Sequence, residues 1–266
     1  MKLSIKALVL VIIPLILLSC SQDEILEVAY LKGQKSDRSS KLYKRSEGVL
    51  NGNVKIIQEV FYGKNNNVDS VIRNNVGHAI ETFKVEYRGN KLSRIKYFLD
   101  YGISSNNNIS YNYIVNSSIG HIKLEDPNWI FEIYHSGVYI DSTKSINPSD
   151  INSIAHNQFF NRNENDQLVS NGWYSYPDDY SAYTYSNFDS GKNPGPLNTV
   201  IEIPNNESIL YIILGLKLSK DNPLTIELPY GESHNMTLNY DEEGYVTQGI
   251  WNFDDSFVES HFYIEQ

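Results

Sequence analysis

The chain has 266 residues and a formal net charge of −10 at pH 7, from 32 acidic and 22 basic side chains. Because nucleic-acid binding depends on Lys and Arg contacts to phosphates, this acidic balance argues against a nucleic-acid partner. Tyr is abundant at 20 residues, against 2 Met, and this composition favours strands over helices. Cys20 is the single cysteine, so the sequence offers no intramolecular disulfide.

The N-terminus predicts export and lipid attachment. Two lysines precede an apolar run over residues 7–18, which is shorter than the roughly 20 residues that cross a bilayer as a helix. An uncleaved transmembrane anchor is therefore the weaker alternative. The sequence LLSC, which ends at Cys20, resembles the bacterial lipoprotein signal. The resemblance implies a signal peptide over residues 1–19, acylation of Cys20, and association with a membrane through this N-terminal lipid anchor.

Residues 20–48 follow as a polar segment of mixed charge, and we expect a flexible tether with a short strand over residues 41–45. The tetrapeptide SQDE, directly after Cys20, resembles the signal that sends lipoproteins of Bacteroidota to the outer face of the outer membrane. The resemblance implies an outer-membrane lipoprotein exposed at the cell surface. A domain that faces the periplasm is the alternative.

Residues 49–266 predict one β-rich domain of repeated hairpins. Residues 81–88 alternate apolar with polar side chains, which is the period of a half-buried strand, and Gly89-Asn90 follows as a two-residue turn. A single hairpin is marginal in water, whereas hairpins that share an apolar face stabilise one another.

The hairpins share a degenerate repeat. Each copy places a tyrosine before the turn and two aliphatic residues, three positions apart, after it. Residues at that spacing point to opposite faces of a regular strand, so the repeat predicts a bulge or a twist after each turn. The copies are Tyr62 with Val68 and Val71, Tyr87 with Leu92 and Ile95, and Tyr113 with Ile119 and Ile122.

We therefore expect an all-β fold: an antiparallel β-meander of these hairpins in an extended or curved sheet, with one or two short helices. One helix is predicted over residues 150–156. A second is predicted from the spacing of Ile209, Ile212, Ile213 and Leu216, although β-branched residues also fit a buried strand.

The sequence contains no recognisable catalytic or metal-binding pattern. Its 6 histidines form no pair with metal-ligand spacing, and the HExxH, CxxC, Walker and GxSxG motifs are absent. Adjacent acidic residues such as Asp178-Asp179 are interpreted as solvated turns, although two carboxyl groups roughly 5–9.5 Å apart would suit glycoside hydrolysis. We predict no catalytic residue, no metal ligand and no cofactor.

A run of aromatic residues is the strongest candidate for a binding surface. Aromatic rings stack on sugar rings, and a row of them beside Asp178 and Asp179 would form a shallow platform for a polysaccharide. The alternative, which the abundance of tyrosine elsewhere in the chain favours, is a set of cross-strand ladders that only cover the sheet. The candidate glycan-binding residues are Trp173, Tyr174, Tyr176, Tyr180, Tyr183 and Tyr185.

Three motifs mark the C-terminal part: YTY at 183–185 leading to KNP, LSKDNP at 218–223, and YDEEGY at 240–245. Together they look like an uncharacterised family of Bacteroidota outer-membrane lipoproteins whose tyrosine-rich β-sheets are similar to YD repeats. The chain departs from that family at Val246, where proline is frequent, and in having the dipeptide YD only once. The family has no established activity, so the resemblance implies a fold and an address rather than a mechanism.

These features predict a lipid-anchored envelope protein with a non-enzymatic binding or surface-scaffold role, and with a polysaccharide or an envelope protein as its partner. One alternative is a hydrolase of surface glycans or peptides that uses a carboxylate pair. Another is an adhesion or assembly subunit whose partner adds to an exposed sheet edge.

Overall fold

The computed structural model describes residues 41–63, 66–101, 109–147, 150–175, 179–191, 207–251 and 257–265. The expected signal peptide, Cys20 and the tether up to residue 40 lie outside the described residues, and they stay predictions. The first strand begins at Lys41, within the range expected for the tether, and it is longer than the short strand predicted there.

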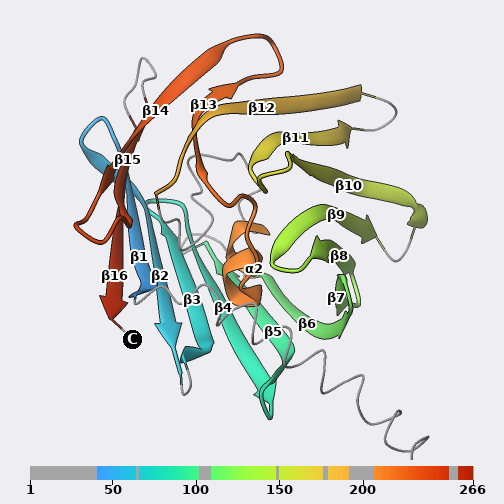
Figure 1. Cartoon of the computed structure of the whole chain (residues 1–266). Coiled ribbons are helices and arrows are strands. Elements are labelled where there is room, and N and C mark those ends of the chain that lie inside the picture. Colours follow the sequence, from blue (N-terminus) through green and yellow to red (C-terminus); the bar gives the residue numbers. More distant parts are fainter. Residues whose placement is uncertain are drawn as a thin grey trace, which may run out of the picture. The chain divides into compact units, whose positions relative to one another are not determined.

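Sixteen strands in the described residues form one antiparallel sheet that follows chain order (Figure 1). They are β1 (Lys41–Leu50), β2 (Asn53–Tyr62), β3 (Val68–Asn75), β4 (Ala79–Arg88), β5 (Lys91–Asp100), β6 (Ile109–Ser118), β7 (His121–Asp126), β8 (Trp129–Ser136), β9 (Tyr139–Asn147), β10 (Asp150–Arg162), β11 (Leu168–Ser175), β12 (Asp179–Asp189), β13 (Asn222–Glu227), β14 (Ser233–Tyr240), β15 (Val246–Trp251) and β16 (Phe257–Glu265).

The sheet closes on itself because β1 pairs with β16, from Lys41 opposite Glu265 to Leu50 opposite Phe257. The expectation of an extended or curved open sheet is therefore wrong, and the fold is a closed antiparallel barrel. The physical reason is that alternation within a strand specifies a buried face but not the identity of the neighbouring strand. Closure gives hydrogen-bond partners to both strands that would otherwise be sheet edges.

The predicted bulges are present in two of the three repeat copies. The pairing register shifts beside Tyr62 and beside Tyr87, so both aliphatic residues of each copy face the core. The bulge predicted for the third copy is wrong. Ile119 lies in the turn and is 77% exposed, and the pairing of β6 with β7 is regular. The same shift recurs beside His135, Arg162 and Tyr240.

Tyrosine hydroxyls tie neighbouring strands together near these bulges. Tyr87 Oη donates to the carbonyl of Val68 at 3.0 Å, and Tyr263 Oη donates to the carbonyl of Val246. Both carbonyls belong to the first residue of a strand, next to a register shift. Because a bulge interrupts the backbone ladder, a side-chain donor satisfies an acceptor there.

The second predicted helix is confirmed as α2 (Glu207–Leu214). It ends where Gly215 adopts φ +65°, with Gly215 N donating to Ile212 O and Leu216 N donating to Tyr211 O, which is a Schellman cap. No helix of the described residues is long and apolar enough to cross a membrane. The helix predicted over residues 150–156 is wrong, because that segment begins β10. Register shifts on both sides of Ile154 make the pairing of β10 with β9 irregular. The segment also lacks the alternation of apolar and polar residues that predicts a strand.

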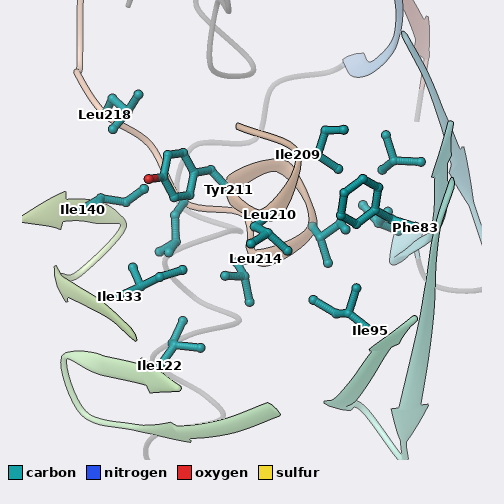
Figure 2. Close-up of a cluster of buried hydrophobic side chains, with 14 of the residues drawn as sticks. Phe83, Ile95, Ile122, Ile133, Ile140, Ile209, Leu210, Tyr211, Leu214 and Leu218 are labelled. Atoms are coloured by element: carbon teal, nitrogen blue, oxygen red, sulfur yellow. The ribbon is translucent and has the colours of Figure 1, made fainter. Parts of the chain in front are cut away.

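Helix α2 belongs to the hydrophobic core of the barrel (Figure 2). It is apolar on all sides, as expected of a helix that is buried all round. Ile209 lies on the side of Phe83 of β4, and Tyr211 lies on the side of Ile140 of β9. Beyond the helix, Lys217 pairs with the start of β9, where its N–H donates to Val138 O at 2.7 Å and its carbonyl accepts from Ile140 N at 3.0 Å.

The inner face of the barrel wall is largely apolar, whereas the outer face mixes charged side chains with exposed apolar ones such as Phe61, Phe98 and Ile114. Inward positions such as Ile122, Leu124 and Ile133 are buried. Between them, Lys123 and Glu132 face outward as cross-strand partners, and Glu132 also pairs with Lys144 on β9. An outward cluster on β4 and β5 has the same character, with Glu86 in ion pairs with Arg94 and Lys96.

Candidate functional site

A row of polar residues crosses the otherwise apolar inner wall. Its members are direct cross-strand partners on five adjacent strands, in the order His261 on β16, Ser46 on β1, Gln58 on β2, Arg73 on β3 and Glu81 on β4. None of them is more than 5% exposed. We call this set the polar row.

Hydrogen bonds connect the polar row to helix α2. Arg73 Nε and Nη2 both donate to Gln58 Oε1, at 3.2 and 3.0 Å, and Nη2 also donates to Ser208 Oγ at 2.8 Å. Gln58 Nε2 in turn donates to Tyr43 Oη at 3.2 Å. Because Ser208 lies in the first turn of α2, Arg73 fixes the helix to the wall.

The electrostatic environment of the polar row is that of a buried, charged cluster. Burial lowers the pKa of Arg73, and the nearby carboxylates of Glu81 and Glu259, together with Tyr43, oppose that shift by favouring the cation. Burial, reinforced by Glu259, raises the pKa of Tyr43, so its phenol stays neutral at physiological pH. Glu259 lies on β16 at the inward position next to His261.

Several buried atoms of this cluster have no hydrogen-bond partner among the described residues. They are Glu81 Oε2, Glu259 Oε2, and both ring nitrogens of His261. The other carboxylate oxygen of Glu81 accepts from Asn75 Nδ2 at 2.9 Å. No group of three or more His, Cys, Asp or Glu side chains in the described part of the chain is arranged to hold a metal ion.

The polar row is not predicted from the sequence alone, although each strand carries a local signal for its own member. Gln58 lies between Val60 and Ile56 on the inward alternation of β2, and Arg73 and Glu81 fall at inward positions beside Val71 and Phe83. A polar residue on an apolar face can be found by its period. That five such residues form one row depends on the pairing of the strands.

His261 is expected to make the stability of the barrel fall in mild acid. Burial lowers its pKa in the folded state, and neighbouring Glu259 offsets only part of this shift. Below about pH 6.5 the unfolded chain therefore binds more protons than the folded chain, and stability falls by up to about 1.4 kcal/mol per pH unit. Urea unfolding at pH 7.5 and 5.0 would measure the loss, which His261→Gln should reduce. Exposed His78 provides the matched control, and an equal reduction in His78→Gln would contradict this assignment.

The structure divides the predicted glycan-binding residues between the two faces of the wall. Tyr185 is buried and Tyr183 packs against the core, and the rings of Tyr183 and Trp173 lie 5.0 Å apart on that inner side. Tyr174 and Tyr180 face outward, about half exposed. Tyr176 lies outside the described residues. The five described residues therefore do not form one continuous row, and glycan binding stays a prediction.

The outward pair forms a small aromatic patch with Phe159. Tyr174 and Tyr180 are direct cross-strand partners with ring centroids 5.1 Å apart, and Phe159 meets the Tyr174 ring edge-on at 5.8 Å. Tyr180 lies over Gly172, where a side chain would collide with its ring. Glycine at this position therefore makes room for the ring on the strand surface.

The protein is a closed, up-and-down β-barrel whose interior contains helix α2 and a buried polar cluster. No family model matches the chain, and no curated protein matches it. The resemblance to tyrosine-rich Bacteroidota lipoproteins therefore stays a prediction.

The solved structures that are similar to this chain include two porin-like proteins. One is a porin-like protein from Bacteroides uniformis ATCC 8492, with 10% identity and a TM-score of 0.41, over 84% of this chain and 96% of that chain. The other is a porin-like protein from Bacteroides vulgatus ATCC 8482, with 10% identity and a TM-score of 0.45, over 84% of this chain and 99% of that chain. At this identity and these TM-scores, the similarity indicates nothing about function.

Proposed function

We propose that the chain is an outer-membrane lipoprotein with a non-enzymatic binding or surface-scaffold role, whose barrel stands in water while acylated Cys20 holds it to the membrane. The observation that carries the proposal is the polarity of the wall. A barrel embedded in a bilayer turns an apolar band outward and a polar surface inward. Here the outer wall carries charged side chains such as Lys123, Glu132 and Lys144 among exposed apolar ones such as Phe61, Phe98 and Ile114, and the apolar core lies inside.

The lipid anchor supplies the membrane affinity that such an outer wall lacks. Each buried methylene of an acyl chain contributes about 0.8 kcal/mol, and two or more chains anchor a protein stably. The signal that ends at Cys20 and the acidic residues after it support attachment to the outer membrane with the barrel at the cell surface.

Phase separation in a cloud-point detergent, combined with palmitate labelling, tests this arrangement. The wild-type chain is expected in the detergent phase with label. A Cys20→Ala variant, exported by a cleavable signal of the secreted type, should appear unlabelled in the aqueous phase and remain folded. A Cys20→Ala barrel that still enters the detergent phase would overturn the proposal. Protease treatment of intact cells would then separate a surface location from one facing the periplasm.

The geometry favours a binding role over the alternatives from the sequence. Glu81 and Glu259 both lie on the inner wall, but four strand spacings of about 4.8 Å separate their strands, or roughly 19 Å along the wall. A glycosidase pair needs its carboxyl groups roughly 5–9.5 Å apart. Addition of a partner strand needs a free sheet edge, and the described strands close into a barrel.

Glycan binding through Tyr174 and Tyr180 is a second candidate function. Two half-exposed aromatic rings at 5.1 Å, supported by Phe159, provide the flat apolar surface on which a sugar ring stacks. Retention on polysaccharide affinity gels should fall at least about tenfold when both tyrosines become alanine, since a loss of about 1.4 kcal/mol has that effect. Tyr230→Ala, at a residue that is 96% exposed, is the control. Unchanged retention of the double variant would exclude this surface.

A further inference from the structure

A second pair of rings lies on the outer wall, in line with the aromatic patch of Tyr174, Tyr180 and Phe159. The rings of His121 on β7 and Tyr134 on β8 are stacked, with centroids 4.7 Å apart and 26° between their planes. We propose that this second pair and the aromatic patch together bind one linear, uncharged polysaccharide, which lies across β7 to β12. The inference rests on the proposed glycan binding at Tyr174 and Tyr180, and it adds the class of glycan and the further residues that contact it.

Direct strand pairing places the two groups of rings in one row. His121 pairs with Tyr134. Ser142 on β9 pairs with Tyr134 on one side and with Phe159 of β10 on the other, and Phe159 pairs with Gly172 of β11. The strands from β7 to β12 are consecutive neighbours in the wall (Figure 1), so five spacings of about 4.8 Å give the row a length of roughly 24 Å. One sugar ring cannot span that length, whereas a chain of several rings can.

The rings of the row are exposed on the outer face. Tyr134 is 39% exposed, and Tyr174 and Tyr180 are 51% and 52% exposed. Ser142, between Tyr134 and Phe159, has a short side chain that does not extend over the rings on its two sides. Aromatic surfaces at several points along one row suit a chain of sugar rings, since each sugar ring has an apolar face of its own.

Contacts within the wall hold the rings in place before any ligand binds. Tyr134 Oη donates to Glu132 Oε2 at 3.1 Å, and the ring of Tyr134 stacks on that of His121. Phe159 meets the ring of Tyr174 edge-on at 5.8 Å. Rings that are already ordered lose little conformational entropy on binding, so more of the stacking energy contributes to affinity.

The charged side chains beside the row balance one another. Glu132 is the cross-strand partner of both Lys123 and Lys144, and Lys123 also forms an ion pair with Glu125 at 2.6 Å. A polyanion or a polycation would therefore meet charges of its own sign as often as opposite ones. An uncharged sugar chain avoids this repulsion, and its hydroxyl groups can hydrogen-bond to carboxylates and ammonium groups alike.

The opposite border of the row is neutral and rich in hydrogen-bonding groups. Asn161 of β10, Ser170 of β11 and Thr184 of β12 are cross-strand partners there. Asn161 Nδ2 donates to Ser170 Oγ at 2.9 Å. Amide and hydroxyl groups both donate and accept, as sugar hydroxyls do. The outer wall thus combines aromatic surface along the row with polar groups on both sides, and polar groups of this kind fix the orientation of a ligand.

Binding measured as a function of glycan length tests the inference. The full lipidated chain in mild detergent is passed over gels of starch, xylan, mannan and chitin, and a polysaccharide that retains it is cut into fragments from disaccharide to decasaccharide. For the wild type we expect the affinity in calorimetric titrations to rise at least about tenfold from the shortest to the longest fragment, because contacts along one chain reinforce one another. Tyr134→Ala should remove most of this rise and leave the disaccharide affinity unchanged.

Phe98→Ala is the matched control, because it removes an aromatic ring that is 42% exposed on β5, outside the row, and it should bind every fragment as the wild type does. Affinity that does not rise with length, or a Tyr134→Ala variant that binds like Phe98→Ala, would overturn the inference. Loss of binding in the double variant of Tyr174 and Tyr180 would then show that the proposed glycan binding itself stands. A wild-type chain that no gel retains, or a double variant that binds like the wild type, would overturn both. Retention on anionic alginate but on none of the neutral gels would overturn the assignment to an uncharged ligand.

Discussion

Replacement of Arg73 by methionine is expected to lower the free energy of unfolding by about 3–5 kcal/mol, the usual cost of leaving buried charge without its partner. Arg73 donates to Gln58 and Ser208, and it is the direct cross-strand partner of buried Glu81, with which it interacts electrostatically. Methionine retains much of the apolar volume, so the loss reports the charge and the hydrogen bonds rather than a cavity. Urea unfolding at pH 7.5 gives the measurement.

Two further variants separate this effect from a general sensitivity to loss of arginine. Arg94→Met removes a side chain that is 42% exposed and ion-paired with Glu86, and exposed pairs contribute only about 0–1 kcal/mol. Adding Glu81→Gln to Arg73→Met should recover part of the loss, because the uncompensated carboxylate is then neutral. If Arg73→Met and Arg94→Met destabilise equally, the polar row does not hold the barrel together.

Truncation of Tyr211 to alanine is expected to destabilise the barrel by about 3–5 kcal/mol, as for other large aromatic residues in a core. Tyr211 is fully buried on helix α2 and meets Phe160 of β10 edge-on, with ring centroids 6.5 Å apart. Removal of its ring leaves a cavity between the helix and the wall, which the closed sheet cannot collapse to fill. The midpoint of urea unfolding should fall accordingly.

The same change at Tyr230, which is 96% exposed, should alter stability by less than about 0.5 kcal/mol. Tyr211→Phe isolates the hydroxyl from the ring and should cost far less than Tyr211→Ala. A Tyr211→Ala variant as stable as Tyr230→Ala would mean that helix α2 does not pack inside the barrel and is not part of its core.

The hairpin repeat shows how far local patterns reach. Val68 and Val71 are three positions apart, so they can share one face of a strand only if a bulge adds an extra residue between them. The register shift beside Tyr62 confirms this predicted bulge. Ile119 fitted the same spacing but lies in a turn, since Ser118 pairs directly with His121. The spacing of two aliphatic residues predicts which face they share only when both lie in the strand, and Ile119 does not.

Local residue spacing did not predict the secondary structure correctly where strand pairing decided it. Residues 150–156 have helical spacing, yet they start β10 because β9 offers backbone partners to Asp150, Ile154 and His156. The pairing of β10 with β11 begins only after this segment, at Asn157. The segment around Ile209 is also β-branched, and it is a helix because it has no strand partner and apolar side chains on every face.

The candidate sites divide in the same way. Each residue of the polar row sits at an inward position that strand period alone predicts, but the row exists only because five strands pair in a particular register. Tyr174 and Tyr183 are close in sequence but lie on opposite faces of the wall, because Tyr174 faces outward and Tyr183 packs against the core.

The sequence by itself determined the antiparallel hairpins, two of the bulges and helix α2, because each depends on residues close together in the chain. The export signal that ends at Cys20 stays a prediction. Tertiary structure alone decided the closure of β1 on β16, the enclosure of α2, and the meeting of His261 with Ser46. Residues so far apart in sequence leave no shared period, and only pairing and packing of the whole sheet bring them together.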